Sequence, residues 1–525
     1  MPMRKSRSLV RLKSDVFGPA IAARAAAFRD IESGRGPTAG FGKGYEMELD
    51  WRVCSRARLA RDARFDGKFY IGVHSTRIYC RPICHARASR EENVCYFSTA
   101  AAAAAAGFRP CLRCRPECSP GTPAWAGTKT TVARALRLLN ESSLEEGGVE
   151  ALADHLGVGS RHLRRLFLRH LGATPRDIAQ TRRLHFAKKL IDETRLPMTQ
   201  IALASGFGTV RRFNAAIRAV YDRTPTQIRA LARQKPSDAE NQYEFRLVFR
   251  RPYSWSYMLK FLAAHAARGI EAIEGGCYRR TISVKGSEGF LEVSADEPRD
   301  ELRVRVQIDD PGLLFAIIER VRAMFDLDAD WSIIEKTLKA DPLLAALLMA
   351  DPGRRIAGCF DAFELTVRAI LRRRTRPPKL AAQLNGIIET FGRPYSPAKH
   401  LTHLFPTPQA LCDADLESLR VPRTHADSIR AVARAACLGR IAFDKIADTA
   451  DFLHALAGCP GVGAQTIEYV AMRALRDTDA FPMSSSELKR VLEAGDPLAL
   501  QPRALSWRPW RAYAAVYLSP SLGEH

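Results

Sequence analysis

Hydrophobic and polar positions alternate differently along the chain and divide it into four stretches. Residues 66–73 and 94–97 alternate with a period of two, which predicts short strands. Residues 128–232 have apolar side chains at helical spacing, and helical spacing returns from residue 311 onward. Between the helical stretches lie four segments that alternate as in an antiparallel sheet: 243–249, 278–284, 289–293 and 302–306. The pattern predicts a multidomain α+β protein.

Composition places the boundaries between these stretches. Residues 1–48 are rich in Arg, Ala and Gly, so we expect a disordered basic arm. Met47 precedes a sequence typical of a domain start, which makes it an alternative start of translation. A helix at 252–268 is expected to cross the sheet. The expected folded units are a small cysteine-rich unit at 49–120, an all-α unit at 121–235, a small antiparallel α+β subdomain at 243–310 and an all-α unit at 311–525.

The charge of the chain indicates its partner. Its 525 residues have a formal net charge of +23 and a pI of about 9.8, which favours double-stranded DNA as the partner. No apolar run reaches the roughly 18 residues of a membrane span, so no membrane partner is expected. Twelve cysteines without a secretory leader favour metal ligation in a reducing compartment. We expect a cytoplasmic, nucleoid-associated bacterial protein.

Four of the cysteines have the spacing of a metal site. Cys80 and Cys84 form one pair and Cys111 and Cys114 form another, separated by a strand and by a short helix at 100–106. Two such pairs can place four thiolates tetrahedrally around one Zn²⁺ ion. The spacing therefore predicts a small domain with one zinc ion bound by four cysteines. A purely structural zinc knuckle is the alternative to a reactive site.

The sequence around these cysteines resembles the N-terminal domain of the Ada alkylation-response proteins. The resemblance covers about fifty residues, among them 66–69, 78–82, 92–94 and 106–116. It implies that Cys80 is both a zinc ligand and the nucleophile that irreversibly takes a methyl group from a methylated DNA phosphate.

Methyl transfer would also change the charge of the cluster. A thioether at Cys80 removes one negative charge, which increases the attraction to the phosphate backbone, so methylation would act as an electrostatic switch. Arg81 and Arg113 are candidate phosphate contacts, and a solvated basic rim is the alternative interpretation. The same two interpretations apply to Arg77, Arg109 and Arg115.

A helical unit repeats within 128–232, because Thr174-Pro175 returns as Thr224-Pro225. In each copy a short helix, a turn and a basic second helix follow one another, and Ser160 is expected to cap the first basic helix. The segment resembles an AraC-type DNA-binding domain, which implies two helix-turn-helix units in adjacent major grooves. A bundle with an ordinary charged face is the alternative. The candidate base readers are Ser160, Arg161, Arg164, Thr209, Arg211 and Arg212.

A Pro-Gly-Val-Gly turn at 460–463 lies between two predicted helices. Gly461 and Gly463 allow a phosphate to approach the backbone, and the next helix begins there. Together with 361–371, 469–475, 479–482 and 509–514, the turn resembles the helix-hairpin-helix DNA glycosylases of the AlkA type over residues 243–520. The resemblance implies a DNA-3-methyladenine glycosylase fold that flips a base into a pocket. Candidate pocket residues are Gln465, Trp510 and Tyr513, although the two aromatic residues are also typical of a core.

The chain departs from the AlkA pattern at residues that would take part in the reaction or lie beside it. Such glycosylases use an aspartate to stabilise positive charge on the sugar, and its position falls on Ser485, whose neutral hydroxyl cannot supply that field. Glu487 and Asp479 are the possible substitutes. An arginine-rich run at 372–376 replaces the residues usual there, either as a solvated surface or as a new phosphate clamp.

Three functions remain open at this point. The first is an alkylation-response protein that repairs methyl phosphotriesters at Cys80, activates repair genes with RNA polymerase and excises alkylated purines. The second retains sensing and transcription control but makes the C-terminal region a noncatalytic DNA clamp, which Ser485 favours. The third is a regulator with a purely structural zinc. The absence of a Pro-Cys-His-Arg motif indicates that no alkylguanine-repair domain is included.

Overall fold

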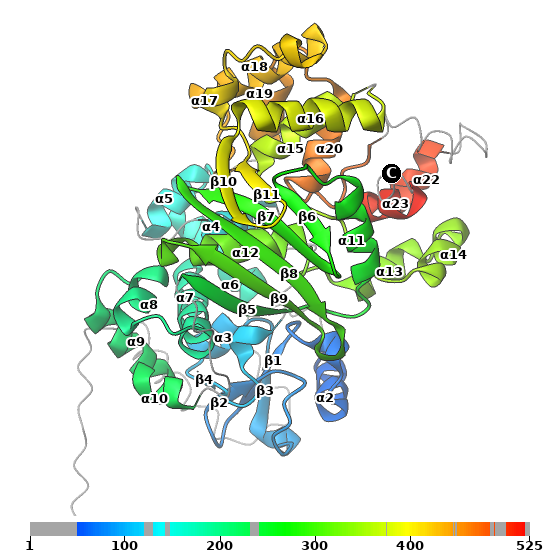
Figure 1. The fold of residues 1–525 in the computed structure, drawn as a ribbon. Helices are drawn as coiled ribbons and strands as arrows, with labels where there is room; N and C mark the ends of the chain where they lie inside the picture. The colour runs from blue at the N-terminus through cyan, green and yellow to red at the C-terminus, as the bar shows by residue number, and fades with distance from the viewer. Residues whose placement is uncertain are drawn as a thin grey trace, which may run out of the picture.

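The computed structural model contains one chain in which four packed regions follow the predicted order of strands and helices (Figure 1). It describes residues 50–119, 130–141, 148–231, 241–373, 375–444, 446, 449–482, 488 and 500–519. The predicted arm at 1–48 and the alternative start Met47 lie outside these residues.

The first region, here called the zinc module (50–119), is a small sheet with helices beside it. Its strand order is β3-β1-β2-β4. Thr99 caps the alanine-rich helix by accepting a hydrogen bond from the amide of Ala102, so the predicted helix is confirmed. The elements are α2 (Trp51–Ala60), β1 (Tyr70–Val73), β2 (Ile78–Cys80), β3 (Val94–Phe97), α3 (Ala100–Ala105) and β4 (Arg109–Pro110).

The second region contains the two predicted helix-turn-helix units. They comprise α4 (Thr130–Glu141), α5 (Gly148–His155), α6 (Ser160–Leu171), α7 (Pro175–Glu193), α8 (Met198–Ala204), α9 (Val210–Tyr221) and α10 (Pro225–Ala230). The repeat has a local cause: Thr174 and Thr224 each close a capping box, with Asp177 and Gln227 respectively. The expected cap at Ser160 is wrong, because the N-cap of α6 is Gly159 and Ser160 is the first helical residue.

The third region is a five-stranded antiparallel sheet with the strand order β5-β9-β8-β7-β6. Helix α11 (Trp255–Ala264) lies where the sequence placed a helix. The four predicted strands are present, and β6 was not predicted. The strands are β5 (Gln242–Val248), β6 (Glu271–Glu274), β7 (Cys277–Val284), β8 (Ser287–Asp296) and β9 (Glu301–Ile308).

The fourth region is helical, as expected, with one departure from the all-α prediction. A two-stranded ribbon of β10 (Arg393–Ala398) and β11 (Leu401–Leu404) interrupts it. Prolines 394 and 397 lie in β10 and obscure the strand pattern in the sequence. The helices are α12 (Leu314–Met324), α13 (Trp331–Leu338), α14 (Pro342–Ala350), α15 (Ala362–Arg372), α16 (Pro377–Phe391), α17 (Pro408–Leu411), α18 (Arg423–Cys437), α19 (Thr449–Ala457), α20 (Ala464–Arg473), α22 (Leu500–Ser506) and α23 (Arg511–Leu518).

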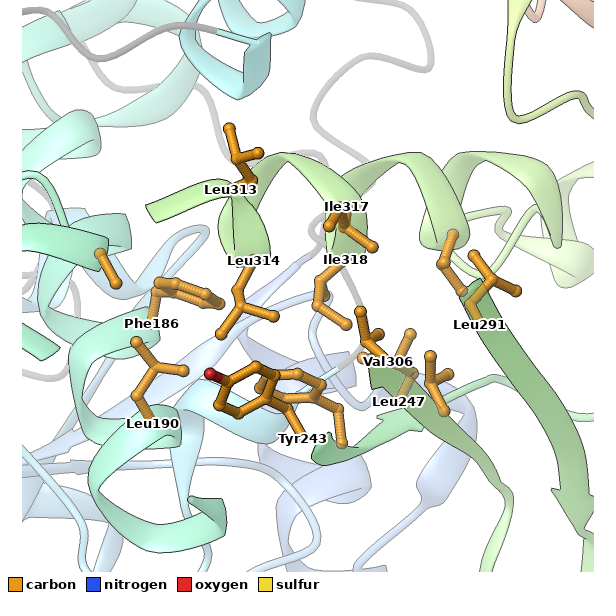
Figure 2. Packing of buried hydrophobic residues seen from close by; sticks show 14 of the residues in the cluster. Phe186, Leu190, Tyr243, Leu247, Leu291, Val306, Leu313, Leu314, Ile317 and Ile318 are labelled. Carbon is orange, nitrogen blue, oxygen red and sulfur yellow. The ribbon is translucent and has the colours of Figure 1, made fainter. Parts of the chain in front are cut away.

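The second helix-turn-helix unit and the five-stranded sheet share one buried core. Figure 2 shows Phe186 and Leu190 of α7 against Tyr243 of β5 and Leu314 of α12, all within a single cluster of buried residues. The packing thus crosses residues 232–240, where the sequence suggested a boundary, and it fixes α7 against the sheet. Within the described part of the chain, no helix has the length and apolar character that crossing a bilayer requires.

Candidate functional site

The zinc module brings the four predicted cysteines together. Strands β2 and β4 pair in parallel, with Tyr79 opposite Pro110, so Cys80 and Cys111 follow at the ends of neighbouring strands. The amide of Cys111 donates to the carbonyl of Tyr79 at 3.0 Å and fixes this register. The sulfurs of Cys80, Cys84, Cys111 and Cys114 all lie within 4.8 Å of one another.

The donor set fits one zinc ion. Tetrahedral Zn²⁺ with Zn–S bonds of about 2.3 Å needs four thiolates about 3.8 Å apart, which the 4.8 Å limit on the sulfur separations accommodates. The cluster can therefore hold a single Zn²⁺ through four cysteine sulfurs.

The four sulfurs differ in their surroundings. The amide of Arg81 donates to the sulfur of Cys114 at 3.3 Å. Among the hydrogen bonds of the described residues, none joins a backbone amide to the sulfur of Cys80. An amide hydrogen bond stabilises a thiolate and lowers its nucleophilicity. The amide hydrogen bond therefore sets Cys114 apart from the other three sulfurs, among which Cys80 is the nucleophile that the resemblance implies.

Arg81 supports the cluster from inside the module. Its side chain is buried; Nε donates to Asp66 at 2.8 Å, Nη2 also bonds Asp66, and Nη1 donates to the carbonyl of Cys114 at 3.0 Å. Its predicted contact with DNA phosphate remains a prediction, and in this position the guanidinium orients the loop of Cys114. Arg113, the other predicted phosphate contact, is exposed.

Tyr79, the residue before Cys80, connects the zinc module to α7. Its buried hydroxyl lies 2.8 Å from Nε2 of His185. Burial lowers the pKa of His185 to about 4, so the ring is neutral and shares a hydrogen bond with the hydroxyl of Tyr79. Sequence patterns could not reveal this contact, because its two residues are 106 positions apart.

The predicted base readers lie on the exposed faces of the two second helices. Arg161 and Arg164 are exposed on α6, where Arg164 pairs with the equally exposed Glu150 at 3.3 Å, and Ser160 is half-buried. In the second unit, Thr209 caps α9 by accepting from the amide of Arg212 at 3.2 Å. Arg211 and Arg212 are exposed. Both helices thus present basic side chains to solvent, as insertion into a groove requires.

The glycine turn at 458–463 joins α19 to α20, as predicted. Gly461 has a φ of +79°, and a Cβ there would lie 2.2 Å from Oγ of Ser428. Gly463 is the N-cap of α20 in extended conformation. The tight approach of α18 therefore requires glycine at 461, while the first amides of α20 remain available to an anion.

Two arginines of the predicted basic run bind the protein itself. Nη1 of Arg373 donates to the carbonyl of Gly461, and the guanidinium of Arg372 lies 5.2 Å from the ring centre of Tyr469. Arg374 lies outside the described residues, whereas Arg376 is exposed. Both interpretations of this run, a solvated surface and a phosphate clamp, stay predictions, and in this structure Arg372 and Arg373 contact the protein itself.

Two of the candidate base-pocket residues, Trp510 and Tyr513, contact each other edge to face with ring centres 6.0 Å apart. Trp510 and Tyr513 are 3% and 1% exposed and belong to a buried cluster, where the Tyr513 hydroxyl donates to Asp326 at 2.7 Å. Gln465 is exposed at the start of α20. A pocket role for the three stays untested, and the alternative core interpretation describes where the two aromatic side chains lie.

The acidic candidates have different positions. Ser485 and Glu487 lie outside the described residues. Asp479 is described, and its carboxylate accepts from Arg508 at 2.8 Å and from Arg511 at 2.7 and 3.0 Å. These three bonds occupy both of its oxygens.

Family models match three parts of the chain. The metal binding domain of Ada matches residues 53–117, a helix-turn-helix domain matches residues 152–231, and the AlkA N-terminal domain matches residues 244–361. Each match coincides with a region whose geometry is described above. Zinc and DNA are therefore partners of this chain.

Individual relatives extend these matches. Escherichia coli DNA-3-methyladenine glycosylase 2 is 28% identical over 277 residues, which are 52% of this chain and 96% of that protein. The E. coli bifunctional transcriptional activator/DNA repair enzyme Ada is 42% identical over 118 residues, 22% of this chain and 32% of that protein.

One relative spans nearly all of the chain. A probable bifunctional transcriptional activator/DNA repair enzyme AlkA of Mycobacterium tuberculosis (strain H37Rv) is 37% identical over 489 residues, which are 91% of this chain and 98% of that protein. Its alignment includes the zinc module, the helix-turn-helix pair and the glycosylase-like region together. The chain therefore belongs to the family of bifunctional transcriptional activators and DNA repair enzymes that join Ada-type and AlkA-type parts.

Proposed function

We propose that the chain senses and repairs DNA alkylation at Cys80 and activates transcription in response. One observation carries this proposal: Cys80 contributes a sulfur to the four-cysteine cluster, within the segment that matches the metal binding domain of Ada. The site of action is the bacterial cytoplasm at the nucleoid, and the substrate is a methyl phosphotriester in double-stranded DNA. Domain limits of 49–120, 121–235, 243–310 and 311–525 form part of the proposal.

The reaction is a direct displacement at carbon. Bound Zn²⁺ keeps the thiolates deprotonated at neutral pH. The Cys80 sulfur attacks the methyl carbon, an S–C bond forms, the C–O bond to the phosphotriester breaks, and the phosphate leaves as an anionic diester. The amide hydrogen bond from Arg81 makes the Cys114 sulfur less available for attack. The product thioether has no route back to a thiolate, so each molecule reacts once.

The experiment follows the methyl group. Full-length protein is incubated with duplex DNA bearing methyl phosphotriesters, and peptide masses are recorded. We expect a gain of one methyl group on the peptide containing Cys80, its loss in Cys80→Ser, and its retention in Cys437→Ser, which removes an exposed cysteine far from the cluster. Methylation of another ligand in the wild type, or of none, would contradict the assignment.

The transcriptional part uses the exposed arginines of α6 and α9. We propose promoter DNA and RNA polymerase as partners, with Arg161, Arg164, Arg211 and Arg212 facing base edges or phosphates. A reporter with a promoter bound by the protein tests this. Arg212→Ala is expected to lower activation at least tenfold, whereas Arg223→Ala, in the loop after α9, leaves it unchanged. Equal losses would indicate general charge rather than recognition.

For the C-terminal region we propose a DNA clamp without glycosylase activity. The support is the occupied carboxylate of Asp479 together with Ser485 at the position of the family's aspartate. An active DNA-3-methyladenine glycosylase, with Glu487 in place of the aspartate, is the second candidate, because the turn and its helices are retained.

Release of methylated purines from alkylated duplex DNA separates these two candidates. No release by the wild type and release by Ser485→Asp would support the clamp with a decayed site. Release by the wild type would contradict the clamp and favour another carboxylate, which Glu487→Gln and Asp479→Asn then distinguish.

A further inference from the structure

A cavity of about 480 Å³ opens between the zinc module and the five-stranded sheet region. Loops beside Cys114 form one wall, and the end of β5 with the turn before β9 forms the other. Its volume is within the range of sites that bind small molecules. The lining contains seven arginines and three carboxylates, a formal excess of four positive charges. Such a lining indicates an anionic ligand.

Two of the arginines build the walls. Arg81 is bound to Asp66, and Nε of Arg250 donates to the carbonyl of Asp66 at 3.0 Å while its Nη1 donates to that of Asp328 at 3.1 Å. Both guanidiniums are buried. These bonds join the two regions and fix the position of the cavity beside the zinc cluster.

The guanidinium groups of other arginines at the cavity are exposed to solvent. The side chains of Arg64, Arg251 and Arg299 are 75%, 64% and 57% exposed. Each of these arginines pairs with a nearby carboxylate. Ion pairs this exposed contribute little to stability, so a phosphate can displace the carboxylates from the arginines at a small cost in free energy. Arg113 is exposed on the zinc side of the same cavity. Planar guanidinium forks match the oxygens of a phosphate in pairs.

We propose that this cavity binds a phosphate group of the DNA backbone, held between the zinc module and the five-stranded sheet. The sheet region thus supplies Arg251 and Arg299 to the same DNA segment that the zinc module approaches. The inference rests on the proposed function only in taking DNA as the ligand of the zinc module. Neither Cys80 chemistry nor base excision is needed for it.

The salt dependence of DNA binding provides the test. Each phosphate contact contributes about 0.9 to the slope of log K against log salt for duplex DNA. For the full chain on undamaged duplex without a promoter site, the double variant R251A/R299A is expected to lower the slope by about 1 and to weaken binding at least fivefold. The control R303A/R305A removes two arginines of β9 that are 47% and 48% exposed and do not line the cavity, and we expect it to leave the slope unchanged.

Two results would overturn the proposal. An unchanged slope in R251A/R299A, with normal thermal unfolding and zinc content, would exclude a DNA phosphate at the cavity. Equal slopes in the cavity and control variants would assign the effect to a general basic surface. Calorimetry with inorganic phosphate distinguishes a DNA phosphate from a free phosphate ion. If the wild type bound inorganic phosphate while R251A/R299A left the salt slope of DNA binding unchanged, the ligand would be a free anion and the proposal would be overturned. Methyl uptake at Cys80, measured on the same variants, shows separately whether the proposed function holds.

Discussion

The zinc module and the helical fourth region, called the glycine-turn region below (described residues from 311 to 519), both keep their family framework. They differ in the groups that would perform chemistry. At the cluster, the four sulfurs that would bind zinc meet within 4.8 Å of one another. At the turn, Gly461 and Gly463 keep their backbone roles, whereas the carboxylate of the candidate Asp479 is bound by two arginines. The zinc module thus brings its candidate reactive groups together, whereas the described candidate acid near the turn is already paired.

The largest expected effect is on the zinc module alone. Cys111 is the most buried ligand, so Cys111→Ser or chelation should unfold residues 50–119, because structural zinc contributes roughly 10 kcal/mol or more. Zinc content and limited proteolysis measure this, with Cys437→Ser as the control. If the glycine-turn region became protease-sensitive to the same degree, the two regions would form one cooperative unit and the comparison would fail.

The next effect concerns an ion pair that connects the two regions. Nζ of Lys68 in the zinc module lies 2.8 Å from Asp330 at the start of α13, and both side chains are largely buried. Lys68→Met leaves a buried carboxylate with fewer partners, and about 3 kcal/mol of unfolding free energy should be lost. Urea unfolding measures the loss. Lys260→Met, at an exposed position on α11, should have almost no effect. If Lys68→Met lost no more unfolding free energy than Lys260→Met, the two regions would not be coupled through this ion pair.

The two regions also differ in how much the sequence could predict. Cys80, Cys84, Cys111 and Cys114 were found because ligand spacing within a short segment is a local signal. The contact of Lys68 with Asp330, the contact of Tyr79 with His185 and the shared core of α7 with β5 depend on packing between distant segments, which a single sequence does not encode in any period. For the same reason the aromatic residues Trp510 and Tyr513 kept two interpretations until their burial was known.

A substitution at the turn sharpens the claim that its framework is intact. Gly461→Ala places a methyl group 2.2 Å from Oγ of Ser428 at a φ of +79°, and should cost about 1 to 3 kcal/mol and weaken nonspecific DNA binding. Gly458→Ala is the matched control, because a Cβ there meets its nearest atom at 3.4 Å. Thermal unfolding and DNA binding of both variants provide the measurement. Similar values for the two variants would show that the turn does not depend on glycine at 461.

The smallest effect is a pH dependence at His265, which follows α11 and faces Arg372 of α15. Burial, followed by the charge of Arg372, lowers the pKa of His265 to about 3; its Nδ1 donates to the carbonyl of Phe261 at 2.8 Å, and Nε2 faces Arg372 at 3.5 Å. The folded pKa is below the unfolded value of about 6.5, so the stability from neutral His265 is complete above pH 6.5 and is lost as the pH falls toward 3.

Between pH 6.5 and 5 this loss should reach up to about 2 kcal/mol, and His265→Gln should remove that part of the pH dependence without affecting the zinc module. Urea unfolding at several pH values, monitored separately by zinc release and by hydrogen exchange in α15 and α20, measures it. A pH dependence unchanged in His265→Gln would mean that His265 and Arg372 do not face each other in solution. Arg372 would then be available to DNA, and the arginine run would again be a candidate phosphate clamp.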